Sequence, residues 1–331
     1  MQLAHAGKPS VAPHATRESG RGRHADKPSD VSKPGWLDIL WRTKKEISDD
    51  NLSIVAAGVA FYAFLAVVPS FAAIVAVYGL VSNPSQVAHQ IELLARVVPS
   101  EVLPLLHQQL TRITSHTQAA GISAIVGFVL ALYSSANATK ALITGLNIAY
   151  GESERRSFLK LTAIAFVLTI GGIVGAVHGV ALVAVLPSLL AHVPIARSTE
   201  NVLNWLRWPV LVIGFVTALA MMYRYGPSRR DAKWRWVSWG AATATLLWLL
   251  ASAAFSLYVS RFGSYDKTYG SLGAVVVFLM WLYLSAFVIL IGAELNSEME
   301  RQTKKDTTVG PPKPIGQRGA RSADTVGPSR Q

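Results

Sequence analysis

Four polar residues recur at helical spacing along one otherwise apolar segment. They are Asn137, Lys140, Thr144 and Asn147, at offsets of three and four that fall on one face of a helix. A lysine at the centre of a membrane helix costs about 2.5–3.5 kcal/mol on insertion scales. The stripe therefore predicts a polar cavity or gate inside a helical bundle. An alternative with equal weight ends the helix near residue 138 and leaves the stripe in water.

A carboxylate and an amide close the last apolar segment. Glu294 and Asn296 lie at its rim, and we group them with the same cavity or gate. Glu294 is a candidate partner for Lys140, or for Arg155 and Arg156. Such a pair is either a structural lock or a functional gate or proton site.

A proline and a glycine stripe mark positions of helix packing or hinge motion. Pro69 lies near the middle of the apolar segment 54–81 and predicts close packing or, alternatively, a hinge. Gly171, Gly175 and Gly179 form two GxxxG steps, which let a second helix approach closely. Packing within the chain is favoured, and packing against a second copy in a homo-oligomer stays open.

The residues that most enzyme classes need are missing. The chain has no cysteine, which excludes disulfides, thiolate metal sites and cysteine nucleophiles. Nucleotide-binding, zinc-protease, serine-hydrolase and EF-hand motifs are absent, and no carboxylate pair lies within an apolar segment as a nuclease centre would require. We therefore expect no catalytic residues, no metal, no cofactor and no enzymatic activity.

Composition indicates that most of the chain lies in a membrane. Of its 331 residues 51% are hydrophobic and 15% charged, whereas soluble domains carry about a quarter charged residues. A membrane helix needs about 20 apolar residues, and long runs without strict alternation favour helices over strands. The predicted fold is all-α, a polytopic membrane domain over 36–300. Its six transmembrane helices are expected at about 54–81, 121–146, 161–186, 208–223, 236–259 and 272–293.

The segments outside these helices differ in character. Residues 1–35 and 301–331 combine Pro, Gly and Ser with basic residues and little aliphatic content, which predicts two disordered basic tails. Between the first two spans, apolar residues recur at helical spacing over about 86–115. This pattern predicts outer amphipathic helices that lie on the membrane or cap a cavity.

Lysine and arginine alternate in number from one connection to the next. Residues 1–51 hold nine, and the five connections and the C-terminal tail that follow hold 2, 4, 2, 5, 2 and 7, with Lys140 counted in the second connection. The positive-inside rule then places both termini in the cytoplasm, as an even number of spans requires. The net charge of +12 is thereby explained by attraction to an anionic cytoplasmic leaflet, without a nucleic-acid partner.

Three stretches of the chain resemble the YihY/BrkB family of bacterial inner-membrane proteins. They are 49–64 with Pro69, 146–150 with Arg155, Arg156 and Phe158, and 269–273 with 281–283 and 292–296. The resemblance covers about residues 36–300 and implies a multi-pass helical protein of the bacterial plasma membrane with a role in the cell envelope. It offers no established catalytic residues, and it implies that the label ribonuclease BN, once given to part of the family, is a misannotation.

Residues and resemblance together predict translocation of a lipid-like amphiphile or a small solute. The polar stripe, the break at Pro69 and the glycine-rich third helix motivate this prediction. The alternative is a membrane scaffold that docks an envelope or cytoplasmic partner, which the tails and the outer amphipathic helices favour. A ribonuclease is disfavoured.

Overall fold

In the described residues the secondary structure is helical. The computed structural model describes residues 20–81, 117–185, 197–261 and 271–330. Within these ranges the exception is one isolated antiparallel bridge between Ala232 and Thr308. The predicted all-α fold is confirmed. The amphipathic helices predicted over about 86–115, and residues 1–19 of the predicted N-terminal tail, lie outside the described residues.

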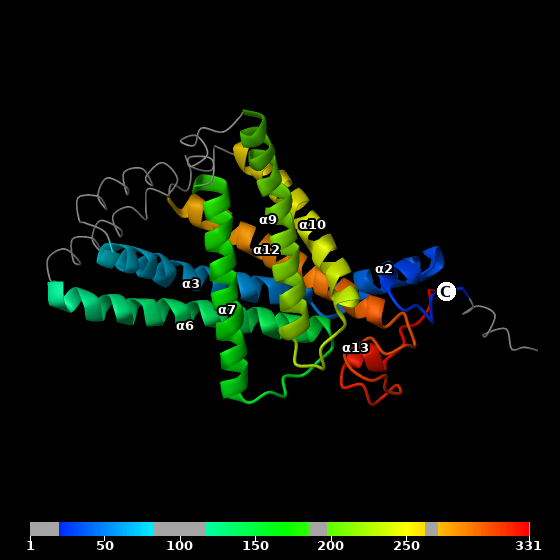
Figure 1. Ribbon diagram of the computed structural model, residues 1–331. Coiled ribbons are helices and arrows are strands. Elements are labelled where there is room, and N and C mark those ends of the chain that lie inside the picture. Colours follow the sequence, from blue (N-terminus) through cyan, green and yellow to red (C-terminus); the bar gives the residue numbers. More distant parts are fainter. Residues whose placement is uncertain (1–19, 82–116, 186–196, 262–270, 331) are drawn as a thin grey trace, which may run out of the picture.

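Long helices account for most of these ranges (Figure 1). Five of the described helices are long and apolar enough to cross a membrane, and the bent pair of α2 and α3 qualifies as a sixth. The bounds are α2 (Lys33–Asp49), α3 (Leu52–Val81), α6 (Thr117–Ala149), α7 (Phe158–Val180), α9 (Arg197–Tyr225), α10 (Trp234–Arg261) and α12 (Ser271–Glu300).

Several helices extend past the apolar segments that predict them. α6 continues to Ala149, so the whole polar stripe is helical and the alternative in which the helix ends near residue 138 is wrong. α9 begins at Arg197 and α12 ends at Glu300, well beyond the predicted limits of 208 and 293. Hydropathy marks only the apolar part of a helix, whereas backbone hydrogen bonds and caps decide where the helix ends.

The sharp bend in the first helical region lies at Asn51. α2 and α3 meet at an angle of 64°. Asn51 between them has a φ of 49°, in the left-handed region that asparagine tolerates better than most residues. Its N–H donates to the carbonyl of Ser48 at 3.1 Å. α3 then continues through Pro69 to Val81 as one helix.

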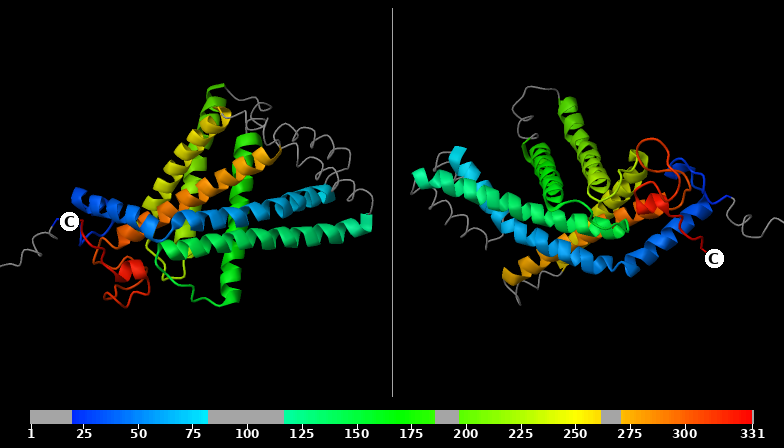
Figure 2. Two further views of the ribbon diagram at one scale, coloured as in Figure 1. Left: turned by 180° about the vertical axis from the view of Figure 1, so that it is seen from behind. Right: turned by 90° about the horizontal axis from the view of Figure 1, so that it is seen from below.

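The helices converge at one end of the molecule and diverge toward the other (Figure 2). α3 packs along α6, while α12 packs against both α3 and α10, and α7 crosses α6 (Figure 1). The largest buried apolar cluster lies at the convergent end. It includes Leu52, Leu146, Tyr223, Val237 and Leu290, which come from five different helices.

A tight helix crossing joins Gly240 of α10 to Gly292 of α12. A Cβ atom on Gly292 would lie 2.8 Å from the carbonyl oxygen of Gly240 and would overlap the hydroxyl of Tyr223. The glycine stripe of α7 behaves differently, because no atom of the described chain lies within 4 Å of a Cβ built on Gly171 or Gly175. Gly179 alone approaches a neighbour, at 3.7 Å from Leu211. Among the described residues, the predicted packing within the chain is therefore not found at the first two glycines of this stripe.

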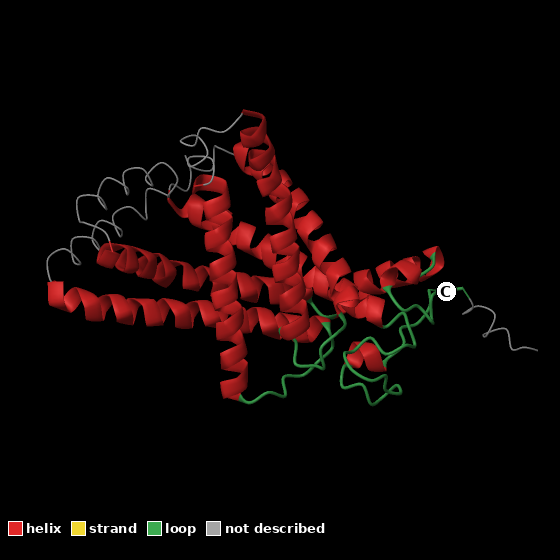
Figure 3. Cartoon of the chain, viewed as in Figure 1, coloured by secondary structure: helices red, strands yellow, loops and turns green. Residues whose placement is uncertain are grey.

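The segments predicted to be disordered tails fold together at the end of α12. We call residues 20–32 and 301–330 the cap. The cap is largely loop, with two short helices, η1 (Pro28–Asp30) and α13 (Arg321–Asp324) (Figure 3). The N–H of Lys304 donates to the carbonyl of Arg23 at 2.8 Å, which joins the two ends of the chain. The structure thus differs from the disorder predicted for 301–331, and over residues 20–35 from that predicted for 1–35.

Buried arginines explain why such a polar segment is ordered. Arg318 is only 4% exposed and donates to the backbone carbonyls of Lys304, Lys305, Lys313 and Ala323 at 2.6–3.1 Å. A low aliphatic content predicts disorder because little apolar surface can be buried. Here hydrogen bonds from a buried arginine to several backbone carbonyls order the segment in place of apolar packing. Composition alone does not indicate such hydrogen bonds.

Candidate functional site

The four residues of the predicted stripe on α6 do not share one environment. Asn147 is buried at the cap end of the helix. Its side-chain amide donates to the carboxylate of Glu154 at 3.1 Å, and its side-chain oxygen accepts from the N–H of Ser228 at 2.7 Å. Asn147 therefore ties the loop after α6 to the loop after α9, and this geometry assigns it a structural contact at that position.

Lys140 lies about two helical turns further from the cap and is half-buried. Its Nζ is 5.0 Å from the ring centroid of Phe158 and 5.9 Å from that of Tyr133. In the described part of the chain no carboxylate lies within ion-pair distance of Lys140. Thr144 is exposed and donates to the carbonyl of Lys140 at 3.0 Å, whereas Asn137 is half-buried.

Glu294 and Asn296 occupy the buried face of α12. The side-chain oxygen of Asn296 accepts from the N–H of Gly240 at 2.9 Å and its amide donates to the carbonyl of Val237 at 3.3 Å. Asn296 therefore fastens α12 to α10. Glu294 is 2% exposed, and its Oε2 has no hydrogen-bond partner among the described residues.

The ion pair considered for Glu294 is not formed. Over the ranges that the structure covers, no salt bridge joins Glu294 to Lys140, Arg155 or Arg156, and Arg156 pairs instead with Glu154 at 2.7 Å. The predicted cavity residues thus lie in separate environments. Lys140 lies beside two aromatic rings, Asn147 joins two loops, and Glu294 and Asn296 are buried on α12. None of them lines either of the two cavities described below.

Two buried ion pairs hold the end of α12. Arg42 of α2 donates to the carboxylate of Glu298, and both side chains are buried. Arg229, in the loop after α9, pairs with Glu300 at 2.6 Å and stacks over the ring of Tyr150 at 4.9 Å. These pairs clamp α12 between α2 and the loop after α9. Nothing local in the sequence signals them, because their partners are far apart along the chain.

Hydrogen bonds and burial shift the pKa values of groups in these loops. The Arg156 guanidinium and N–H lower the pKa of Glu154 to about 2, with a further contribution from Asn147. Burial by itself lowers the pKa of Arg229, but the carboxylate of Glu300 more than offsets it, so the pKa of Arg229 lies above its usual value. At neutral pH the loop ion pairs are therefore fully charged.

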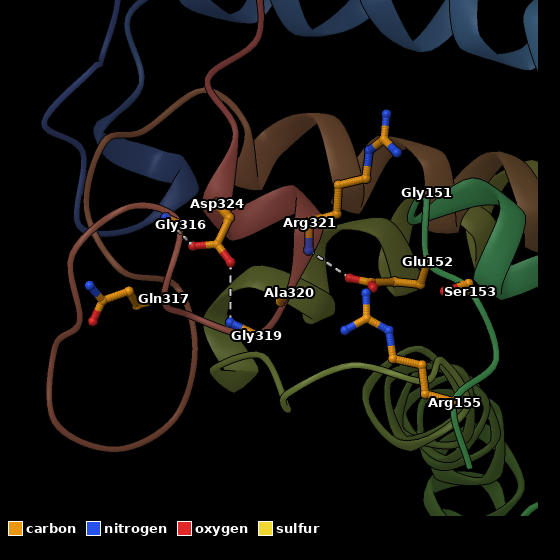
Figure 4. Close-up of a pocket in the computed structure, with 10 residues that line it drawn as sticks. All are labelled: Gly151, Glu152, Ser153, Arg155, Gly316, Gln317, Gly319, Ala320, Arg321 and Asp324. Carbon is orange, nitrogen blue, oxygen red and sulfur yellow. Dashed lines mark hydrogen bonds between the residues drawn. The ribbon is translucent and has the colours of Figure 1, made fainter. Parts of the chain in front are cut away.

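A cavity of about 620 Å³ opens between the loop after α6 and the cap (Figure 4). The carboxylates of Glu152 and Asp324 fix its backbone. Glu152 accepts from the N–H of Arg321 at 2.6 Å, and Asp324 accepts from those of Gly316 and Gly319 at 2.7 and 3.1 Å. The lining residues are Gly151, Glu152, Ser153, Arg155, Gly316, Gln317, Gly319, Ala320, Arg321 and Asp324. Two arginines face two carboxylates here, so the cavity as a whole is close to neutral.

Metal-binding groups are not concentrated in the described residues. Within the ranges covered, no three His, Asp or Glu side chains lie close enough together to hold a metal ion. Helices of this length and hydropathy, packed with a charged cap at one end, define a multi-pass helical membrane protein.

Comparison with known proteins places the chain within that class. Residues 43–315 match the family described as Virulence factor BrkB, and the chain belongs to this family. The resemblance derived from the sequence motifs is thereby confirmed.

The relatives of the chain are bacterial, which is consistent with a multi-pass bacterial membrane protein. One is a ribonuclease-like protein, YfkH, of Bacillus subtilis (strain 168), 30% identical over 62% of this chain and 75% of its own. UPF0761 membrane proteins of Idiomarina loihiensis and Pseudoalteromonas translucida are each 26% identical. They align with 77% and 83% of this chain and with 88% and 89% of their own lengths, respectively. No solved structure matches the chain significantly.

Proposed function

We propose that this protein translocates an anionic, lipid-like amphiphile across the membrane and that Lys140 contacts its headgroup. The observation that carries the proposal is a lysine inside a membrane-length helix that faces two aromatic rings and no carboxylate in the described structure. A cation in such a position is costly unless an anion or water compensates it. The phosphate or carboxylate of an amphiphile supplies that compensation.

The surface next to Lys140 suits the apolar part of such a molecule. Val126, Val129 and Tyr133 precede Lys140 at helical spacing on the same face of α6, and all three are exposed. The ammonium group of Lys140 also lies over the ring of Phe158, an exposed side chain at the start of α7. The face thus carries a charged contact followed by an apolar track, which matches the order of head and chain in an amphiphile.

The neighbouring helix contact fixes this face. The hydroxyls of Thr139 and Thr169 lie 2.7 Å apart, where α7 crosses α6 directly beside Lys140. The scaffold alternative loses part of its motivation, because the described part of the C-terminal tail is folded into the cap. The proposal therefore rests on α6 and α7 and does not involve Glu294.

Reconstitution into liposomes tests the proposal. Movement of a labelled anionic phospholipid between leaflets should fall about tenfold or more for Lys140→Gln, because a hydrogen bond to a charged group contributes about 1.5–3 kcal/mol. Lys140→Arg should restore most of the rate. The matched control is Lys160→Gln, which removes an exposed lysine near the start of α7. Equal rates for Lys140→Gln and the control would exclude Lys140 from the pathway.

A further inference from the structure

A second cavity, of about 300 Å³, lies where three distant parts of the chain meet. The N-terminal part of the cap, the start of α10 and the C-terminal part of the cap each contribute to it. Its lining residues are Ala25, Asp26, Lys233, Arg235, Trp236, Lys305, Asp306, Pro312, Lys313 and Arg318. Five of these side chains are basic and two are acidic, so the lining carries a net positive charge.

The two carboxylates of this cavity are already engaged. Asp26 pairs with Lys305 at 2.6 Å. Asp306 accepts from the N–H groups of Thr308 and Lys313, both at 2.8 Å. Asp26 also interacts electrostatically with Lys233 and Arg235, and Asp306 with Arg318, but neither carboxylate forms an ion pair with these three side chains in the described structure.

No ion pair in the described structure neutralises the remaining basic side chains of the lining, of which Arg318 is buried and Arg235 and Lys313 are exposed. Lys233 donates to the backbone carbonyl of Asp306 at 2.7 Å, and Arg318 donates only to backbone carbonyls. Carbonyls are neutral, so neither charge is cancelled by these bonds. In the described structure the side chains of Arg235 and Lys313 make no hydrogen bond or ion pair. Two carboxylates offset only part of the charge of five basic side chains, so the cavity keeps a net positive charge and donors that no side chain of the lining accepts.

The cavity lies close to the predicted membrane surface. Lys233 and Arg235 flank Trp234, the first residue of α10, at the start of the membrane-length segment Trp234–Ser260. Trp234 and Trp239 are both exposed, as expected for tryptophans at a membrane interface. A ligand in this cavity is therefore within reach of lipid headgroups.

We infer that this cavity binds a phosphate group, with Arg235 and Lys313 as its direct ligands. Phosphate offers several acceptor oxygens and negative charge, which suit guanidinium and ammonium donors. The headgroup of an anionic lipid and soluble phosphate share this chemistry. Either one, once bound, joins the two ends of the chain to the start of α10. The inference is independent of the proposed transport function, because none of these residues lies near Lys140 in the chain.

Binding measurements on the purified full-length protein test the inference. Native mass spectrometry should show retained phosphatidylglycerol in preference to phosphatidylcholine if the source is lipid. Thermal unfolding with inorganic phosphate, against chloride at equal ionic strength, should show stabilisation if the source is soluble. For whichever of the two probes binds, the double variant Arg235→Gln, Lys313→Gln should have an affinity at least tenfold weaker than that of the unmodified protein. The control pair Lys44→Gln with Lys160→Gln removes two exposed lysines outside both cavities and should leave affinity unchanged.

A variant with the opposite effect separates loss of binding from loss of folding. Asp26→Asn removes the partner of Lys305 and one negative charge of the lining, so affinity for the same probe should rise severalfold. The inference is overturned if neither probe binds, if the Arg235 and Lys313 pair behaves like the control pair, or if Asp26→Asn leaves affinity unchanged or lowers it.

Discussion

At the scale of single residues, the buried charges around α12 depend on complete sets of partners. Arg42 is 1% exposed and donates to the carboxylate of Glu298, to its carbonyl at 3.0 Å, to Gln302 at 2.8 Å and to the carbonyl of Pro328 at 2.9 Å. A buried ion pair adds little net stability compared with apolar packing, but the loss of one partner leaves a buried charge uncompensated. Sensitivity to mutation should therefore concentrate in these pairs.

Removal of the charge of Glu298 should destabilise the protein strongly. Glu298→Gln leaves the guanidinium of Arg42 without its carboxylate, which should lower the free energy of unfolding in detergent by about 3 kcal/mol. Asp49→Asn is the control, because it breaks the exposed pair of Lys45 and Asp49 and should change nothing measurable. Similar unfolding curves for the two variants would contradict the importance of this buried pair.

The loop ion pair of Glu154 should make stability depend on pH in the acid range. Its folded pKa, about 2, lies below the ordinary value of 4.5, so the ionised form favours the folded state. That contribution is complete above about pH 4.5, decreases as the pH falls, and is lost below about pH 2. Glu154→Gln should therefore lower the unfolding temperature at pH 6 and have no effect near pH 2. A difference that stays constant over this range would refute the assignment.

At the scale of helices, glycines permit one tight crossing between α10 and α12, whereas two glycines of α7 contact no described helix. α10 and α12 approach so closely at Gly240 and Gly292 that no larger side chain fits, and Asn296 bonds across the same crossing. Gly171 and Gly175 of α7 meet no described atom. Glycine spacing alone indicates a surface that permits close approach, whereas the tertiary arrangement decides which such surface is used.

Two glycine substitutions should separate these cases. Gly292→Ala places a methyl group against Tyr223, Ala244 and Gly240, and overpacking of this kind costs about 1–3 kcal/mol. Gly171→Ala enters open space on α7 and should be neutral or slightly stabilising, because alanine is the better helix former. The fraction of monodisperse protein after purification and the unfolding temperature report both effects. Equal behaviour of the two variants would argue against a tight α10–α12 crossing.

At the scale of the whole molecule, the two described ends of the chain meet on one side. Arg23 donates to the carbonyl of Gly327 at 2.8 Å, and the N–H of Gly327 donates to the carbonyl of Arg301 at 2.9 Å. Ends that meet on one side require an even number of crossings, which agrees with α2 and α3 acting as one bent span beside the other five described helices. Together with the alternation of basic residues, this supports our proposal that the cap faces the cytoplasm.

Site-specific labelling tests this orientation. The chain contains no cysteine, so Gln317→Cys introduces a single thiol at an exposed position of the cap. A membrane-impermeant maleimide should leave this thiol unlabelled in intact spheroplasts and label it after permeabilisation. Labelling of equal extent before and after permeabilisation would place the cap outside.

The sequence predicted the fold class and the positions of the membrane helices because these are local properties. About 20 apolar residues in a row form a helix in lipid whatever their neighbours are, so the apolar cores of α3, α6 and α12 follow from hydropathy alone. The contacts of the candidate site could not be predicted from local sequence. Lys140 is placed on a helix as predicted, but its contact with Phe158 depends on how α7 crosses α6.

Hydropathy and charge alone predict that the chain forms several apolar helices with most of its basic residues at alternate connections. The separate surroundings of Glu294 and Lys140, and the ordered cap at the polar ends of the chain, become visible once the helices are packed. The groups that interact there are far apart along the chain. Arg42 and Glu298 are 256 positions apart, and no local pattern encodes a contact that exists only once the helices have packed.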